Sequence, residues 1–156
     1  MEKFLENLEK AKTITQTADH LVYITYPLIK DKKLLLKILL EIKNAIVYSI
    51  SSILQYEYLY KRITLQKDPK TNFRTFKEKC APKYNITESE IDLIIELLEI
   101  TEKHKKAPME FMRKEKLIIL SENSIQTAVN MDKIKSFISL AKKILINIEN
   151  KFLSKI

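Results

Sequence analysis

Two long stretches of this chain carry an apolar side chain at almost every third or fourth position. The first covers residues 31–63 and the second covers residues 132–153. Steps of three and four place side chains on one face of an α-helix, and such faces bury each other where helices pack nearly antiparallel. We therefore predict that these two helices lie side by side at the centre of one bundle. The predicted faces consist of Leu35, Leu39, Ile42, Ile46, Ser49, Ile53, Tyr56, Tyr60 and Ile63, and of Ile134, Ile138, Ala141, Leu145, Ile148 and Phe152.

The helix over residues 31–63 carries a second apolar stripe beside the first. A helix that is apolar around most of its girth is surrounded by neighbours, so we expect it to be the central helix. Asp31 is its predicted N-cap. The second stripe consists of Leu36, Leu40, Val47, Ile50 and Leu54.

Two more helices are predicted in the first 81 residues. Apolar residues recur at helical spacing over residues 2–26. Pro27 predicts a break at Tyr26, because proline disfavours helical geometry in the residue before it. Residues 73–81 form a short helix, in which Cys80 lies on a buried face with two phenylalanines.

The last part of the chain adds a long helix and a β element. Thr87 and Glu90 have the spacing of a capping box, in which each side chain satisfies a free backbone N–H, so a helix begins there. Residues 116–129 predict a small β-hairpin. The fold class is therefore mainly α: four long helices plus one short helix, with a β-hairpin before the last helix, in a single domain over residues 1–156.

The composition excludes several kinds of site. The chain contains no glycine, one cysteine and two histidines, so glycine-rich phosphate loops are absent. Metal sites in helical bundles often use Glu-x-x-His pairs, but Thr17 and Thr101 stand three residues before His20 and His104. The single Cys80 makes a structural zinc site and an internal disulfide unexpected. We predict no metal and no cofactor.

The apolar segments are not those of a membrane protein. The first residues are charged and lack the apolar core of a secretory signal. The densest apolar run, residues 34–54, is interrupted by Lys37, Glu41 and Lys43, whereas a bilayer span needs about 20 nearly uncharged residues. We expect a cytoplasmic protein that does not contact a membrane.

Charge is distributed unevenly along the chain. The formal net charge is +8, and only three basic residues are arginine, namely Arg62, Arg74 and Arg113. Nucleic-acid readers usually favour arginine, so the lysine-rich composition weakens that interpretation. Residues 87–102 hold six acids and no base. We expect these acids to balance the charge of neighbouring helices.

Aromatic and basic side chains meet near the end of the central helix. Tyr58 with Lys61 and Arg62 forms a candidate stacking and cationic patch, as used for single-stranded RNA. Tyr56 and Tyr60 instead continue the apolar face, and we expect both in the core, with their hydroxyls at a polar rim.

A basic cluster follows the acidic helix and is the main candidate functional site. Its residues are His104, Lys105, Lys106, Arg113 and Lys114. Loops on rigid scaffolds often carry function. Cations at this position also face a helix C-terminus, where positive charge stabilises the helix without any further role.

The sequence resembles a group of uncharacterised small archaeal helical proteins in residues 18–28 and 103–119. In layout it is also similar to HEPN domains, helical bundles found in RNA-cutting toxins and in partners of nucleotidyltransferases. Their catalytic signature is an arginine followed four to six residues later by a histidine. Arg113 has no histidine after it, and His104 precedes it. The resemblance therefore implies a non-catalytic or strongly diverged member.

These observations leave three functional hypotheses. The leading one is a non-enzymatic helical interaction module with a basic surface, which binds a protein partner or itself. The alternative is an RNA-binding protein, in which the bases of residues 30–37, 61–70, 103–116 and 133–143 converge on one face. The third is a diverged HEPN-like ribonuclease or toxin-type protein, in which the histidine and arginine of the basic cluster face one cleft.

Overall fold

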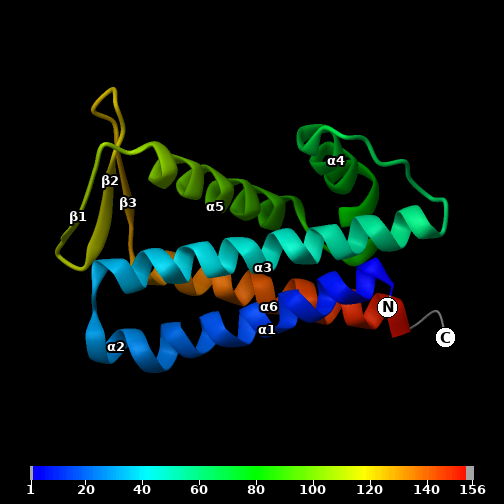
Figure 1. Ribbon diagram of the computed structural model, residues 1–156, viewed down its shortest axis with the longest axis horizontal. Coiled ribbons are helices and arrows are strands. Elements are labelled where there is room, and N and C mark those ends of the chain that lie inside the picture. Colours follow the sequence, from blue (N-terminus) through cyan, green and yellow to red (C-terminus); the bar gives the residue numbers. More distant parts are fainter. Residues whose placement is uncertain (1, 154–156) are drawn as a thin grey trace.

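The computed structural model describes residues 2–153, so the predicted domain's residues 1 and 154–156 lie outside it. Within the described residues, long helices form a bundle with a small sheet at one end (Figure 1), which confirms the mainly α fold. The helices are α1 (Lys3–His20), its extension α2 (Tyr26–Ile29), α3 (Lys32–Leu59), the short α4 (Pro69–Thr75), α5 (Glu88–Lys106) and α6 (Met131–Leu153).

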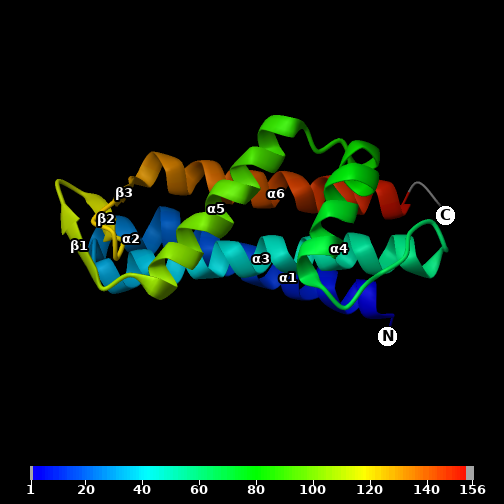
Figure 2. The same ribbon diagram turned by 90° about the horizontal axis from the view of Figure 1, so that it is seen from above.

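α1, α3 and α6 run along one another and pack against each other in pairs (Figures 1 and 2). α4 and α5 lie over α3, on the side away from α1 (Figure 1). The predicted faces of α3 and α6 are buried from Leu35 to Tyr56 and from Ile134 to Ile148. The prediction for Tyr60 is wrong: it is 55% exposed, because α3 ends at Leu59 and the backbone turns away there.

The chain does not break at Tyr26, which corrects the interpretation of Pro27. A π-helical turn over Leu21–Thr25 joins α1 to α2, with the Tyr26 N–H bonded to the Leu21 carbonyl. Pro27 then stands in the first turn of α2, where its missing N–H is not needed. The helix ends instead at Lys30, which adopts the left-handed conformation at φ 31°.

The capping predictions for α3 and α5 are confirmed. The Asp31 side chain accepts a hydrogen bond from the Lys33 N–H at the start of α3. At α5, the Glu90 N–H donates to Thr87 Oγ1 at 3.2 Å, and the Thr87 N–H donates to Glu90 Oε1 at 2.9 Å. Among the described residues, no helix is both long and apolar enough to cross a bilayer.

The β element has one strand more than the predicted hairpin. β1 (Met109–Arg113), β2 (Lys116–Leu120) and β3 (Gln126–Val129) form an antiparallel sheet in that order. β1 was not predicted, because its methionines and glutamate favour helices as readily as strands. The inner face of the sheet closes the end of the core, where Leu117, Ile119 and Val129 are fully buried.

We expect an Asn-Gly turn to stabilise this sheet. Lys114 and Glu115 connect β1 to β2 with φ values of 50° and 64°, and a two-residue hairpin with two positive φ angles favours Asn-Gly. The double variant Lys114→Asn with Glu115→Gly should raise the free energy of unfolding by about 1 kcal/mol.

Urea unfolding measures this change. The control is Glu115→Ala, which removes the exposed ion pair of Glu115 with Lys30 and relieves no backbone strain, so it should give no stabilisation. An Asn-Gly variant no more stable than the parent would contradict this account of the turn.

Candidate functional site

The second apolar stripe of α3 is only partly covered, contrary to what a fully surrounded helix would show. Leu40 and Val47 are 38% and 37% exposed. The cause is the packing of the helices above α3 (Figure 2). α5 crosses over α3 at an angle, and α4 lies over α3 nearer the end of the bundle away from the sheet. The two upper helices therefore leave part of α3 open between them.

This opening is a groove of about 500 Å³, which we call the α3–α4–α5 groove. It has the size of a typical binding pocket. Its walls are mostly apolar, and Lys70 is the one charged residue among them. The lining residues are Val47, Ile50, Ser51 and Leu54 from α3, Pro69, Lys70, Asn72 and Phe73 from α4, and Leu98 from α5.

The α4 wall is short but is held in place by local hydrogen bonds. The Gln66 N–H donates to Asn72 Oδ1, and Asn72 Nδ2 donates to the Gln66 carbonyl, both at 2.8 Å. Asp68 caps the helix by accepting from the Lys70 N–H. On the inner side, the Phe73 and Phe76 rings lie 5.9 Å apart, and Phe76 is fully buried. The groove is thus pre-formed rather than created by a loose loop.

A second hollow, of about 520 Å³, lies between α5 and the helical turns that follow α4. Its rims are charged. Lys77 and Glu78 stand on the α4 side, and Glu88 and Asp92 stand on the α5 side. The α5 wall of this hollow is therefore acidic, whereas the opposite wall carries one charge of each sign.

The acids of α5 are balanced only in part by their neighbours. Glu90 pairs with Lys143 of α6 at 2.5 Å, and Glu96 pairs with Lys133 at 3.1 Å. These two pairs agree with the predicted charge balance between helices. The acids that make no ion pair with any described residue are Glu88, Asp92 and Glu99.

The four basic segments do not converge on one face, contrary to the expectation for an RNA-binding protein. Residues 30–33 contact the sheet end through Lys30 and Lys32, whereas residues 61–70 follow the opposite end of α3 (Figure 1). The α6 bases Lys133, Lys142 and Lys143 are engaged with acids of α5 and α1. Tertiary packing therefore places these segments at both ends of the bundle.

The predicted Tyr58–Lys61–Arg62 patch is divided by a buried ion pair. Glu57 is 1% exposed, and Arg62 donates to both of its carboxylate oxygens, at 3.0 and 2.7 Å. The guanidinium also lies over the Tyr60 ring at 5.2 Å. Arg62 is therefore half-buried and bound to Glu57, while Tyr58 and Lys61 remain exposed.

The surroundings of Glu57 set the pKa of two groups. Burial alone would raise the pKa of Glu57, but hydrogen bonds and charge from Arg62, with smaller contributions from Tyr84 and Lys83, outweigh it and lower the pKa. Cys80 is fully buried, and burial together with the charge of Glu57 raises the pKa of its thiol to about 11. This confirms the predicted burial, and such a thiol is a poor nucleophile.

The His104 cluster is placed at the junction of α5 and the sheet. His104 Nδ1 lies 2.6 Å from Glu110 Oε2, and Lys32 Nζ donates to the Glu110 carbonyl at 3.3 Å. Side chains alternate between the faces of a strand, so Glu110 and Arg113 point to opposite faces of β1. The histidine and arginine are therefore not brought together in one cleft.

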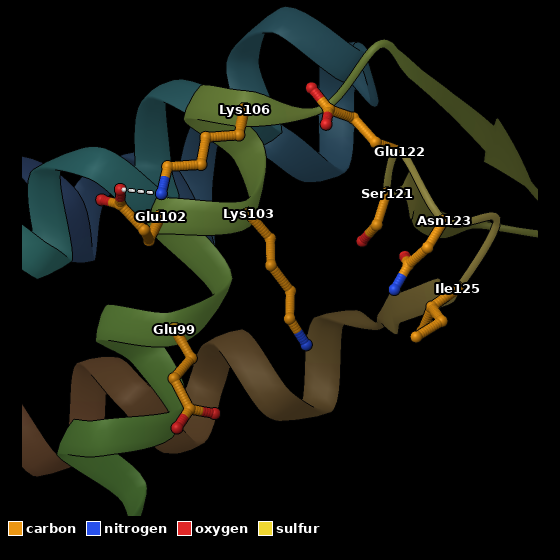
Figure 3. Close-up of a pocket in the computed structure, with 8 residues that line it drawn as sticks. All are labelled: Glu99, Glu102, Lys103, Lys106, Ser121, Glu122, Asn123 and Ile125. Atoms are coloured by element: carbon orange, nitrogen blue, oxygen red, sulfur yellow. Dashed lines mark ion pairs between the residues drawn. The ribbon is translucent and has the colours of Figure 1, made fainter.

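The neighbouring hollow of about 600 Å³ is lined by α5 and the β2–β3 loop (Figure 3). Lys106 pairs with Glu102 at 3.3 Å, and Lys103 donates to Thr127 Oγ1 at 3.3 Å. Ser121, Asn123 and Ile125 form the opposite wall in Figure 3. Its cations are thus satisfied by neighbours, and Lys105 and Lys114 point into solvent.

Comparisons of the chain with protein-family models, curated proteins and solved structures found no match. Among the described residues, no group of three or more His, Cys, Asp or Glu side chains is placed to hold a metal ion. The groove was missed from the sequence because its α3 residues have the pattern of a buried stripe, and only their partial exposure distinguishes them.

Proposed function

We propose that the protein is a non-enzymatic interaction module that binds an amphipathic helix of a protein partner in the α3–α4–α5 groove. The observation that carries this proposal is the pre-formed apolar groove on α3, which has exposed Val47 in its floor and Lys70 at its edge. Helix-in-groove recognition uses apolar anchors at positions i, i+3 or i+4, and i+7. A partner helix with acidic residues beside those anchors would match Lys70.

The similarity to HEPN domains, the archaeal origin and the cytoplasmic location remain proposals. The similarity to HEPN domains suits an interaction module, because a bundle without the arginine–histidine signature would keep the helical scaffold and lose the ribonuclease activity. His104 at the end of α5 contacts Glu110, whereas Arg113 points to the opposite face of β1. This separation supports a non-enzymatic function over a ribonuclease.

Fluorescence polarisation with a designed peptide tests the proposal. The probe is a fluorescein-labelled helical peptide with leucine anchors at helical spacing and glutamate beside them. We expect it to bind the full chain, and we expect Val47→Glu to weaken binding at least tenfold, because the new carboxylate would be desolvated beneath the peptide. Ile146→Glu is the matched control: Ile146 is 59% exposed on α6, outside the groove, and its replacement should leave the affinity unchanged.

A second peptide, with lysine in place of glutamate, should bind less tightly. Equal effects of Val47→Glu and Ile146→Glu, or no preference for the acidic peptide, would overturn the groove as the binding site. RNA binding is the second candidate, favoured by six bases that make no ion pair with a described residue: Lys61, Lys67, Lys70, Arg74, Lys77 and Lys79. A single-stranded RNA probe that binds with a steep salt dependence, while the acidic peptide does not bind, would favour RNA.

A further inference from the structure

The end of the bundle next to the sheet carries a protruding apolar tip. α2 ends there, and Leu28 and Ile29 are 83% and 59% exposed. Ile24, in the π-helical turn before α2, is 54% exposed. Among the large apolar side chains that the structure describes, Leu28 is the most exposed. Neighbouring apolar side chains that stand in water, unlike single ones, mark an interaction surface. We call these three residues the α2 tip.

Positive charge is concentrated in the turn between β1 and β2. Arg113, Lys114 and Lys116 are exposed, and their side chains make no hydrogen bond or ion pair with any described residue. Arg113 and Lys116 stand opposite each other in the register of the two strands, where like charges destabilise a hairpin. An anionic partner would relieve this repulsion. We call these three residues the basic turn.

Contacts between distant residues hold the α2 tip beside the basic turn. Lys30, which follows the tip, pairs with Glu115 between β1 and β2 at 3.2 Å. Lys32 Nζ donates to the Glu110 carbonyl of β1 at 3.3 Å. Figures 1 and 2 both show α2 and the β1–β2 turn at the same end of the bundle. The apolar and the cationic side chains can therefore meet one partner together.

The charge of this end is positive in excess. Residues 30–33 and 113–116 hold six bases and two acids, a net charge of +4. Both acids are engaged within the protein, because Glu115 pairs with Lys30 and the Asp31 side chain accepts a hydrogen bond from the Lys33 N–H. This end thus presents aliphatic surface together with positive charge that the chain does not compensate.

We infer that this end docks on the surface of an anionic lipid bilayer. The α2 tip enters the boundary between headgroups and acyl chains, as the apolar faces of interfacial helices do, and the basic turn lies against headgroup phosphates. RNA would match the charge but would leave the three aliphatic side chains in water, whereas a bilayer contacts both groups. The inference goes beyond the proposed function, since other residues line the α3–α4–α5 groove.

This docking needs no spanning segment. The expectation that the protein does not contact a membrane rested on the charges that interrupt residues 34–54, and among the described residues no helix can cross a bilayer. A surface contact requires only apolar area beside positive charge. Three side chains gathered at the end of a helix supply that area without a long apolar run in the sequence.

Vesicle flotation tests the docking. The vesicles contain phosphatidylcholine alone or with about 30% phosphatidylserine. We expect the full chain to float with the anionic vesicles and not with the neutral ones. Two double variants, Leu28→Ser with Ile29→Ser and Arg113→Glu with Lys116→Glu, should each lower the vesicle partition coefficient by about tenfold or more, because the first removes apolar area and the second reverses charge.

Matched controls make the same kinds of change elsewhere. Leu59→Ser with Ile146→Ser alters two exposed aliphatic side chains, and Lys67→Glu with Lys79→Glu reverses two exposed lysines in the segments after α3 and α4. Both should bind vesicles as the parent does. Val47→Glu should also keep vesicle binding, so a failure of the groove and a failure of the docking are distinguishable. Far-UV circular dichroism confirms that each variant is folded.

A tryptophan at the tip reports insertion directly. The chain contains no tryptophan, so Leu28→Trp introduces a single one. Its emission should shift to shorter wavelength when anionic vesicles are added, whereas the emission of Ile146→Trp should not shift. An unshifted Leu28→Trp, equal binding to neutral vesicles, or equal losses in controls and test variants would overturn the docking. Binding of single-stranded RNA without vesicle binding would overturn it in favour of RNA.

Discussion

Replacing Arg62 by alanine is expected to lower the free energy of unfolding by about 3 kcal/mol. Glu57 is 1% exposed, and its two carboxylate oxygens receive hydrogen bonds from Arg62 at 3.0 and 2.7 Å. Removing the guanidinium leaves a buried negative charge with the Tyr84 hydroxyl at 3.2 Å and Lys83 Nζ at 3.6 Å. Those contacts offset part of the loss, so we expect the lower end of the effect seen when a buried ion pair is broken.

Urea unfolding at neutral pH measures the loss. Arg74→Ala is the matched control, because Arg74 is exposed and makes no ion pair with a described residue; it should change the free energy of unfolding by less than about 0.5 kcal/mol. Similar effects of the two substitutions would show that the Glu57–Arg62 pair contributes little.

The pH dependence of the same variant follows from the lowered pKa of Glu57. A carboxyl whose pKa is lower in the folded than in the unfolded chain adds stability above its unfolded pKa. That contribution is lost as the pH falls through the folded value, which lies below the ordinary 4.5 because Arg62, Tyr84 and Lys83 outweigh the opposing effect of burial. The difference between parent and Arg62→Ala should therefore be largest near neutral pH and shrink below about pH 4.

Ile138→Ala is expected to destabilise the protein by about 3 kcal/mol. Ile138 is fully buried on the apolar face of α6, and truncation removes apolar burial and leaves a cavity. Ile146→Ala deletes the same atoms from the same helix where the side chain is 59% exposed, and should cost less than about 1 kcal/mol. Thermal unfolding of both variants provides the comparison, and equal costs would contradict the packing of α6 described above.

Much of the fold follows from local patterns. The three-and-four spacing predicted α3 and α6 because a helix must bury its apolar face. Asp31 and the Thr87–Glu90 box marked helix starts through hydrogen bonds within a few residues, and these need no tertiary information. Even Cys80 was placed correctly, because its spacing relative to Phe73 and Phe76 is itself a burial signal.

Other features depended on contacts between distant residues. β1 has a weak strand pattern and is fixed by pairing with β2. Pro27 remains inside a helix because the π-helical turn before it removes the need for its N–H. Arg62 does not join the predicted surface patch, because it binds the buried carboxylate of Glu57, five residues earlier near the end of α3.

The amino-acid sequence by itself determined which long segments are helical, where α3 and α5 begin and which main faces α3 and α6 bury, since these depend on side-chain periodicity and on hydrogen bonds between near neighbours. It placed the start of the short helix at residue 73, whereas α4 begins at Pro69, where the proline takes a first-turn position that needs no N–H. Only the tertiary structure decided that α4 and α5 lie apart on one side of the bundle. That separation leaves an apolar groove open on α3. The crossing of packed helices depends on how all their side chains interlock, and no single segment carries that information.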